Sequence, residues 1–515
     1  MKFSSHIKII SLFASLSLLF TGCSFQKKIV NNKGNESTIC VNQVKAMRKN
    51  STKNLVEKYK DLQMIDSHNH DVDQFEKTIS LYDQYYIDKV AITGYVSRES
   101  SILTDELSWK AYSEKPDRFF PLFSGINLFD QSGIEMAKKN LEKGFMGIGE
   151  IAAQSLNSPI LSSAEWKGEH PLDGNLPEIY ELAAKYKAPV LLHIDPPSGL
   201  GLEKLEEALY KYPNTTFIFG HINVANTPKN VDKLMSKHPN LFADIYAGYT
   251  ENNPRDPYTL KDYVKVIEKY SNRIMLGTDS GVEIEYTDAI KAMYKMIDLL
   301  KPATICKVSH ENFLKLMNRQ AATQTQIKEI KKLSDENGIP YEKPKNKHEA
   351  NKLIFKLTKD KNKITKSYEN IPNIKIASLK PLESLNEEEM VAIGRDLLTR
   401  VNFGYLSKDA KVKAKDDWEY YYNSVYFPNA LSESKQDNYK AYPDLNRFEY
   451  LKPSFENESV QKEPDDFIYN VEMNERLKKD SEETPYLTLY RVWIGFDKQS
   501  KTYKIQKILG VDIKR

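Results

Sequence analysis

Short apolar runs alternate with longer amphipathic segments between residues 62 and 319. Apolar positions recur with the spacing of a helix face at 177–186, 202–212 and 260–270. The apolar runs predict eight strands at 64–68, 89–95, 120–127, 146–151, 189–194, 216–221, 241–246 and 274–279. Strands that are apolar almost throughout and are separated by helices predict a parallel sheet buried on both faces.

Eight consecutive strand–helix units favour a closed (β/α)8 TIM barrel of the α/β class over residues 61–319. Roughly 250 residues is the usual size of this fold. A doubly wound open sheet fits the same alternation and stays as the alternative. In both arrangements the carboxyl ends of the strands are where functional side chains gather.

The chain after residue 319 has a different pattern. Residues 320–349 are rich in Lys, Glu, Gln, Asn and Pro, and we expect a linker that is partly helical. Residues 350–515 are expected to form a smaller α+β domain of unknown role, in which Asn386 and Glu389 predict the start of a helix. Two alternating segments predict an antiparallel hairpin, at 486–494 and 504–509.

The first 23 residues have the pattern of a secretion signal. Lys2 and Lys8 precede an apolar stretch at 9–20 that is short for a bilayer span. The stretch ends in Phe20-Thr21-Gly22-Cys23, which resembles the cleavage site of bacterial lipoproteins. The resemblance implies a lipid on Cys23 and an extracytoplasmic protein anchored to the membrane surface. An ordinary signal peptide with an incidental cysteine is the alternative.

Composition adds two expectations. Lys and Arg number 74 against 71 Asp and Glu, and this net charge of +3 gives no electrostatic reason to expect nucleic-acid binding. Three cysteines do not make a disulfide framework. Residues 24–60 predict a solvated tether with a helix from Val41 onward, so we expect Cys40 to be a free thiol and Cys306 a buried packing residue.

Ionisable residues end several of the predicted strands. His68 and His70 are one residue apart, so both side chains point the same way from the first strand. The other strand ends carry Glu150, His193, His221 and Asp279. These ends converge in a barrel, where imidazoles and carboxylates together suit zinc or a similar divalent metal. Burying six such groups without a metal would be costly, which favours a metal site.

The order of motifs along residues 62–318 resembles the amidohydrolase-related metal-dependent hydrolases of the amidohydrolase superfamily. The motifs are IDSHNH at 65–70, KPDRF at 115–119, GFMGI at 144–148, APVLLH at 188–193, KYP at 211–213, NRIMLGTD at 272–279 and ENF at 311–313. The resemblance covers about half of the chain and does not extend to the C-terminal domain.

This resemblance implies roles for the six residues. It makes His68, His70 and His193 metal ligands, with Asp279 as a further ligand and as the general base. It makes His221 either a ligand of a second ion or a group that polarises the substrate. Glu150 departs from the carboxylated lysine of several two-metal relatives and resembles the bridging glutamate of TatD-like hydrolases. One ion and two ions are both compatible with this pattern.

These features predict a surface-anchored metal-dependent hydrolase that uses a metal-activated water on an amide, ester, lactone or phosphoester. The expected cofactor is zinc and the expected partner a small-molecule substrate, whose identity the sequence does not reveal. A long loop at 153–175 lies on the catalytic side, either lining the substrate pocket or covering it. A metal-dependent decarboxylase with the same ligands and a non-catalytic lipoprotein that binds the cell envelope are the alternatives.

Overall fold

The computed structural model describes residues 36–224, 226–359, 381–401, 425–427, 430, 449–479 and 482–513. The predicted signal with Cys23, and residues 24–35 of the predicted tether, lie outside these ranges. Within the described ranges, no helix is both long and apolar enough to cross a bilayer. Lipid attachment at Cys23 stays a prediction.

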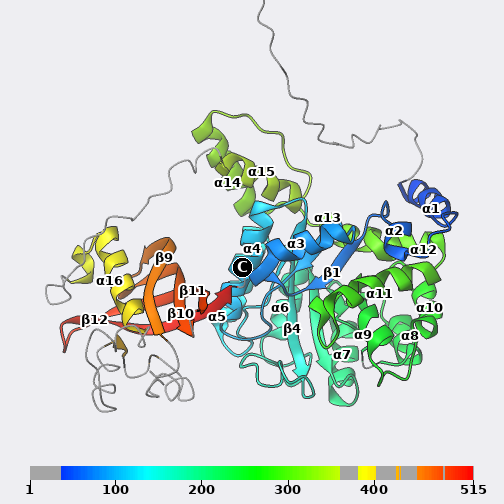
Figure 1. The fold of residues 1–515 in the computed structure, drawn as a ribbon, viewed down its shortest axis with the longest axis horizontal. Coiled ribbons are helices and arrows are strands. Elements are labelled where there is room, and N and C mark those ends of the chain that lie inside the picture. The colour runs from blue at the N-terminus through cyan, green and yellow to red at the C-terminus, as the bar shows by residue number, and fades with distance from the viewer. Residues whose placement is uncertain are drawn as a thin grey trace, which may run out of the picture.

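Eight parallel strands follow one another in chain order around a barrel (Figure 1). They are β1 (Ile65–Asn69), β2 (Lys89–Ile92), β3 (Phe119–Phe123), β4 (Gly147–Ser155), β5 (Pro189–Asp195), β6 (Thr216–Phe219), β7 (Leu241–Tyr246) and β8 (Ile274–Gly277). The surrounding helices are α3 (Phe75–Gln84), α4 (Ser101–Glu114), α5 (Gln131–Lys143), α6 (Leu176–Tyr186), α7 (Leu200–Lys211), α8 (Pro228–Lys237), α9 (Ala247–Asn252), α10 (Leu260–Lys269) and α11 (Tyr286–Leu299). The (β/α)8 prediction is confirmed, and each predicted strand overlaps an observed one.

Side chains join β1 to β8 and close the barrel. The Ser67 hydroxyl donates to the Leu276 carbonyl at 2.8 Å. The buried Asp66 carboxylate accepts from the Thr278 amide at 2.9 Å and from the Thr278 hydroxyl at 2.6 Å. Burial raises the pKa of Asp66 to about 6, although the bonds from Thr278 and Tyr82 oppose this rise. Asp66 thus holds β1 and β8 together beside the predicted metal ligands.

One end of the barrel is closed by α13 (Asn312–Asn318), which follows α12 (Pro302–Cys306) and the π-helix η3 (Lys307–Glu311). Side chains of α13 pack against residues from the beginnings of the strands, namely Ile65, Phe120, Met146, Phe242 and Met275. The opposite end, where the strands finish, is called the mouth below. β4 points toward the mouth at the bottom of Figure 1.

The N-terminal helices α1 (Glu36–Met47) and α2 (Leu55–Lys58) pack on the barrel. Cys40 of α1 forms a disulfide with Cys306 of α12, with the Cα atoms 6.1 Å apart. The expectation of a free thiol at Cys40 and of a mere packing role for Cys306 is wrong. The two cysteines are 266 residues apart in the chain, so only the folded barrel brings them together. No local spacing signals such a pair.

Residues 320–359 form a helical hairpin of α14 (Gln324–Asn337) and α15 (Lys347–Lys359). Hydrogen bonds tie the hairpin to the barrel. The Gln320 side chain donates to the Met146 carbonyl at 2.6 Å, and the Asn351 side chain donates to the Gly144 carbonyl at 2.8 Å. The segment expected as a linker at 320–349 therefore packs as part of the barrel unit.

The C-terminal part holds α16 (Glu387–Val401) against an antiparallel sheet in the order β12-β11-β10-β9. Its strands are β9 (Glu449–Lys462), β10 (Asp466–Lys479), β11 (Glu482–Asp497) and β12 (Thr502–Ile513). Asn386 and Glu389 cap α16 reciprocally, each side chain accepting from the other residue's amide at 2.8 and 2.9 Å. The predicted cap, the β11–β12 hairpin and the α+β class are confirmed.

This sheet packs on the barrel through β12 and α4. Leu509 and Val511 of β12 are buried within the apolar core of the barrel. Among the described residues, three ion pairs cross the contact, Lys110–Glu472, Arg491–Glu106 and Lys507–Glu99. β12 also contacts η1 (Val72–Gln74), a turn that begins two residues after His70.

Candidate metal centre

The six residues predicted to carry the chemistry all lie at the mouth. They are His68 on β1, His70 directly after it, Glu150 on β4, His193 on β5, His221 after β6 and Asp279 after β8. Four of them are buried, whereas His70 and Asp279 are partly exposed. Strand ends distant in sequence therefore converge, as the barrel fold requires.

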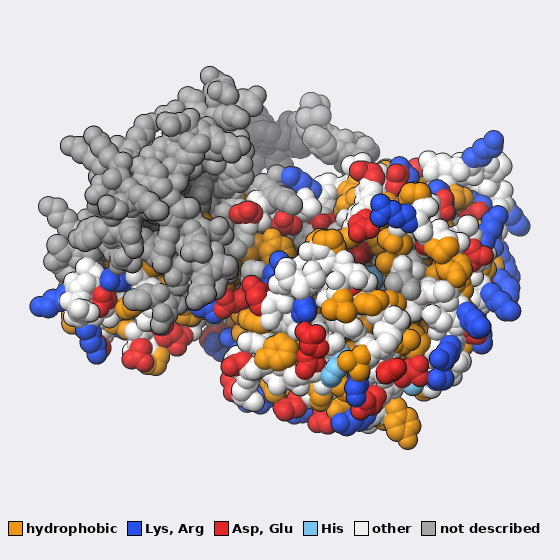
Figure 2. Space-filling view, turned by 90° about the horizontal axis from the view of Figure 1, so that it is seen from below, with side chains coloured by type: hydrophobic (Ala, Val, Ile, Leu, Met, Phe, Trp, Pro, Cys, Tyr) orange, Lys and Arg blue, Asp and Glu red, His pale blue; other side chains and the backbone are white. Residues whose placement is uncertain are grey.

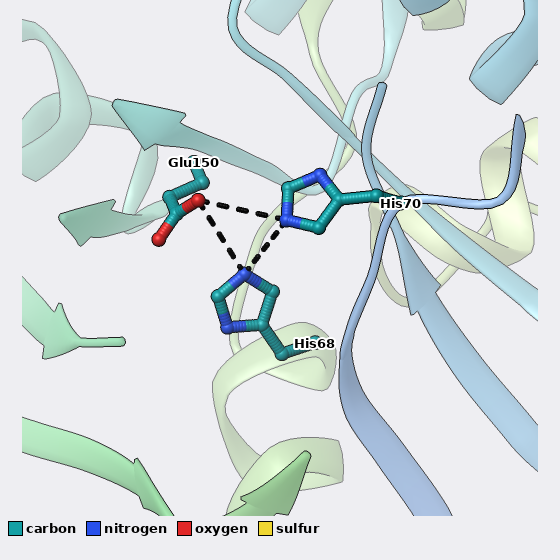
Figure 3. A group of neighbouring side chains, drawn as sticks. All are labelled: His68, His70 and Glu150. Carbon is teal, nitrogen blue, oxygen red and sulfur yellow. Dashed lines mark hydrogen bonds and ion pairs between the residues drawn. The ribbon is translucent and has the colours of Figure 1, made fainter. Parts of the chain in front are cut away.

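His68, His70 and Glu150 form a first group (Figure 3). The Nε2 atoms of the two histidines are 3.1 Å apart. Glu150 Oε2 lies 3.8 Å from the His68 nitrogen and 3.5 Å from the His70 nitrogen. Asp279 Oδ1 lies at the same two distances, 3.8 and 3.5 Å. Two imidazoles and two carboxylates thus face one another.

Glu150 also belongs to a second group, with His193 and His221. Its other oxygen, Oε1, lies 3.4 Å from His193 Nδ1 and 3.1 Å from His221 Nε2. These two nitrogen atoms are 3.1 Å from each other. The carboxylate of Glu150 therefore lies between two pairs of histidines and turns one oxygen toward each pair.

Hydrogen bonds fix which ring nitrogen of three histidines faces the cluster. In each ring the outer nitrogen lies against an oxygen that only accepts, so this nitrogen carries a proton, and in the neutral ring the inner nitrogen presents its lone pair. The acceptors are Asp244 Oδ2 for His68 at 3.2 Å, the Gly94 carbonyl for His70 at 2.8 Å and Asp195 Oδ2 for His193 at 2.5 Å.

This arrangement fits a divalent ion. The inner nitrogen atoms of His68 and His70 face each other across 3.1 Å, a separation that a shared proton or a cation between them would stabilise. Bonds of about 2.0–2.1 Å from one ion to both nitrogens match such a separation at an angle near 100°. Imidazole nitrogen with carboxylate oxygen is a donor set of zinc and similar ions.

Backbone geometry supports the same site. His221 and Asp279 have φ angles of 37° and 47°, in the left-handed region that residues other than glycine rarely adopt. Strain of this kind is concentrated at functional sites. At Gly277, a Cβ atom would approach the His68 Cβ to 2.7 Å, so only glycine lets β8 come this close to the first ligand.

Burial and ion pairing act in opposite directions on the ionisation of the cluster. Burial lowers the pKa of His68, but the Asp244 and Glu150 carboxylates raise it well above its usual value. Burial also lowers the pKa of His193, which Asp195 and Glu150 raise to about 9. Burial raises the pKa of Glu150, and the histidines, His68 foremost, bring it well below its usual value. The carboxylates that raise the pKa values of these histidines also provide negative charge that suits a divalent cation.

Two carboxylates that orient the candidate ligands, Asp195 and Asp244, are absent from the predicted set. Asp244 also accepts from the His221 amide, at 2.7 Å. Asp195 carries a sequence signal, because it lies two residues after His193 and so on the same face of β5. For Asp244 the signal is one acid within the apolar segment LFADIY at 241–246, since a buried carboxylate needs a partner.

A family model described as Amidohydrolase matches residues 65–360, more than half of the chain, including all six candidate residues. The chain belongs to the amidohydrolase family. Enzymes of this family use divalent metals, so the amidohydrolase assignment and the geometry of the cluster agree. The family predicted from the sequence motifs is confirmed.

Solved structures similar to this amidohydrolase cover half of its chain. An uncharacterized TIM-barrel protein from Bordetella bronchiseptica is 16% identical, with 50% of this chain and 98% of that one covered and a TM-score of 0.39. A 2,6-dihydroxybenzoate decarboxylase from Rhizobium is 13% identical (50% and 98% covered, TM-score 0.33). A dihydroxybenzoic acid decarboxylase from Polaromonas sp. JS666, with bound manganese and 2-nitroresorcinol, is 12% identical (50% and 96% covered, TM-score 0.33). No curated protein matches the sequence.

Proposed function

We propose that this amidohydrolase is a hydrolase that holds two divalent ions, with Glu150 between them. The proposed ions are zinc. The observation that carries the proposal is the position of the Glu150 carboxylate, whose oxygens lie 3.1–3.8 Å from four histidine nitrogens in two groups. His68, His70 and Asp279 would hold one ion, and His193 and His221 the other. A one-ion site needs no such bridge.

The bound ions would acidify a water molecule and polarise the oxygen of the scissile bond. Proton transfer falls to Asp279, whose side chain is 13% exposed against 3% for Glu150. Of the two carboxylates in the first group, Asp279 is thus the one that both borders the cluster and reaches solvent. It accepts the proton of the attacking water and donates it to the leaving group. Asp195 and Asp244 hold the rings of His193 and His68.

The test is a panel of esters, lactones, amides and phosphoesters, given to the metal-free chain and to the chain reconstituted with zinc or manganese. Hydrolysis that appears only with metal is expected. Asp279→Asn should keep at least one bound ion and lose activity by about a hundredfold or more. A metal-loaded protein that hydrolyses no member of the panel but releases CO2 from aromatic acids would establish the decarboxylase instead.

We also propose that the protein is extracytoplasmic and lipid-anchored through Cys23. The Cys40–Cys306 disulfide supports this location, because disulfides persist in oxidising compartments. Expression with labelled palmitate should label the wild type in the membrane fraction. Cys23→Ser should be unlabelled, whereas a labelled variant would contradict the anchor.

A further inference from the structure

Large hydrophobic side chains are exposed around the mouth. Ten such side chains are exposed among the described residues, and six lie in the loops or first helical turns that follow barrel strands. These six are 38–59% exposed: Tyr95, Phe129, Leu156, Ile160, Leu200 and Val282. Figure 2 looks onto the mouth end, and hydrophobic and uncharged side chains cover much of the middle of the barrel there. Single exposed hydrophobic residues are ordinary, but a group at a candidate site indicates binding.

Leu156 is attached to the candidate metal centre through Asp195. The Leu156 amide donates to Asp195 Oδ1 at 2.9 Å and to the Asp195 carbonyl at 3.2 Å. The other carboxylate oxygen of Asp195 lies 2.5 Å from His193 Nε2. The loop that exposes Leu156 is therefore held in place by the same carboxylate that orients a ligand.

Tyr95 and Ile160 are connected to each other on the same side of the mouth. Tyr95 follows Gly94, whose carbonyl accepts from the His70 ring at 2.8 Å. The Arg98 guanidinium lies 5.7 Å from the centre of the Tyr95 ring and donates to the Ile160 carbonyl at 3.0 Å. Arg98 thus contacts the Tyr95 ring and the Ile160 backbone, and the side chains of Tyr95 and Ile160 stay exposed.

Val282 lies three residues after Asp279, the last candidate ligand. Its amide donates to the Asp279 carbonyl at 3.0 Å, and its carbonyl accepts from the Tyr246 hydroxyl at 2.9 Å. Tyr95, Leu156, Ile160 and Val282 are named the apolar rim below. Leu156 and Val282 are hydrogen-bonded to Asp195 and Asp279, Tyr95 follows the residue that accepts from His70, and Ile160 accepts from Arg98. Side chains held in place in this way favour binding of an apolar group over a role as a loop that only covers the site.

We propose that the apolar rim binds an uncharged hydrophobic group of the substrate, an acyl chain or an aromatic ring, next to the bond that is cleaved. This inference rests on the proposed hydrolase function. A membrane is the less suitable occupant, because α1, which leads back to Cys23, is bonded to α12 beside the closed end of the barrel. The mouth lies at the other end of the barrel from this attachment.

Straight-chain hydroxamates of two to eight carbons test the apolar rim without requiring turnover. The hydroxamate group binds the metal, and the alkyl chain can then contact the rim. Titration calorimetry on the zinc-loaded full chain should show octanohydroxamate binding about thirty- to a hundredfold more tightly than acetohydroxamate. This corresponds to burial of roughly half of the added methylenes. Leu156→Ser and Val282→Ser should each remove about threefold or more of that gain. Tyr210→Ser is the matched control, since this 85% exposed side chain lies on α7.

Equal affinity for short and long hydroxamates, with zinc bound, would overturn the apolar rim and leave the metal centre standing. Failure to bind zinc or any hydroxamate would overturn the proposed function and the rim together. Binding of the lipid-free protein to phosphatidylcholine vesicles that depends on Leu156 and Val282, without dependence on hydroxamate length, would make the rim a membrane surface and would also overturn the proposal.

Discussion

At the scale of single residues, Asp244 links two parts of the candidate centre. Its Oδ2 lies 3.2 Å from Nδ1 of His68 on β1, and its Oδ1 accepts from the His221 amide at 2.7 Å. Because Asp244 is on β7, it connects a ligand on β1 with a ligand that follows β6. It bonds the outer side of a ligand ring, so its role is to position ligands.

Asp244→Asn should weaken metal binding by about ten- to a hundredfold, as is typical when a carboxylate behind a ligand histidine is lost. Competition with a chelator of known affinity measures the change. Asp105→Asn is the matched control, because this buried carboxylate accepts only from the amides of Ser124 and Gly125 at 2.9 and 2.8 Å. An Asp244 variant with the metal affinity of the wild type would contradict the positioning role.

A second prediction at this scale concerns Lys347, which is fully buried and donates to the Phe145 carbonyl at 3.2 Å. Burial lowers its pKa from 10.5 to about 7. Between these pH values the unfolded chain retains a proton that the folded chain has released, so this group makes stability rise with pH. Lys347→Met should raise the free energy of unfolding by roughly 3 kcal/mol at pH 6 and by less than about 1 kcal/mol at pH 10.

Urea unfolding at both pH values measures this difference. Lys356→Met alters an exposed lysine of the same helix and should change stability equally at pH 6 and pH 10. If Lys347→Met raised the free energy of unfolding equally at both pH values, the buried amine would not be the source of the pH dependence.

At the scale of elements, local sequence patterns predict the strands and helix ends that local sequence determines. The strands and the reciprocal cap of α16 follow from periodicity and from residue types at fixed spacing. The six candidate ligands are predictable because strand ends of a barrel converge. The partners Asp195 and Asp244 are harder to find, because their role depends on contacts that only the folded barrel creates. The segment at 320–349 reads as a linker because few apolar residues suffice for α14 once α15 packs on it.

The disulfide between α1 and α12 gives the prediction at this scale. Cys40→Ser/Cys306→Ser should lower the free energy of unfolding by about 2–4 kcal/mol, because the crosslink restricts the unfolded chain over a separation of 266 residues. Denaturation with and without reductant measures it, and the reduced wild type should match the double variant. A wild type that is indifferent to reductant would contradict the crosslink.

At the scale of the whole molecule, the C-terminal sheet is part of the surroundings of the centre. β12 is buried against the barrel and contacts η1 close to His70, while α1 is bonded to α12 beside the opposite end. We expect the barrel and the sheet to unfold together, since they share apolar core residues.

Leu509→Ala tests this shared core. Leu509 is 2% exposed, and truncation of such a residue costs about 2–4 kcal/mol. Calorimetry should show one transition that shifts to lower temperature, whereas Lys507→Ala at the partly exposed ion pair with Glu99 should cost under about 1 kcal/mol. Two transitions, of which Leu509→Ala moves only one, would show that barrel and sheet are independent.

Metal stoichiometry tests the two-ion centre most directly. The chain without its first 23 residues, reconstituted with zinc, dialysed and analysed by mass spectrometry of its metal content, should hold about two equivalents. Glu150→Ala should hold one or fewer, because the bridge contributes an oxygen to both groups. Asp105→Asn should keep both ions. Two equivalents retained without Glu150, or no metal bound by the intact centre, would contradict the account.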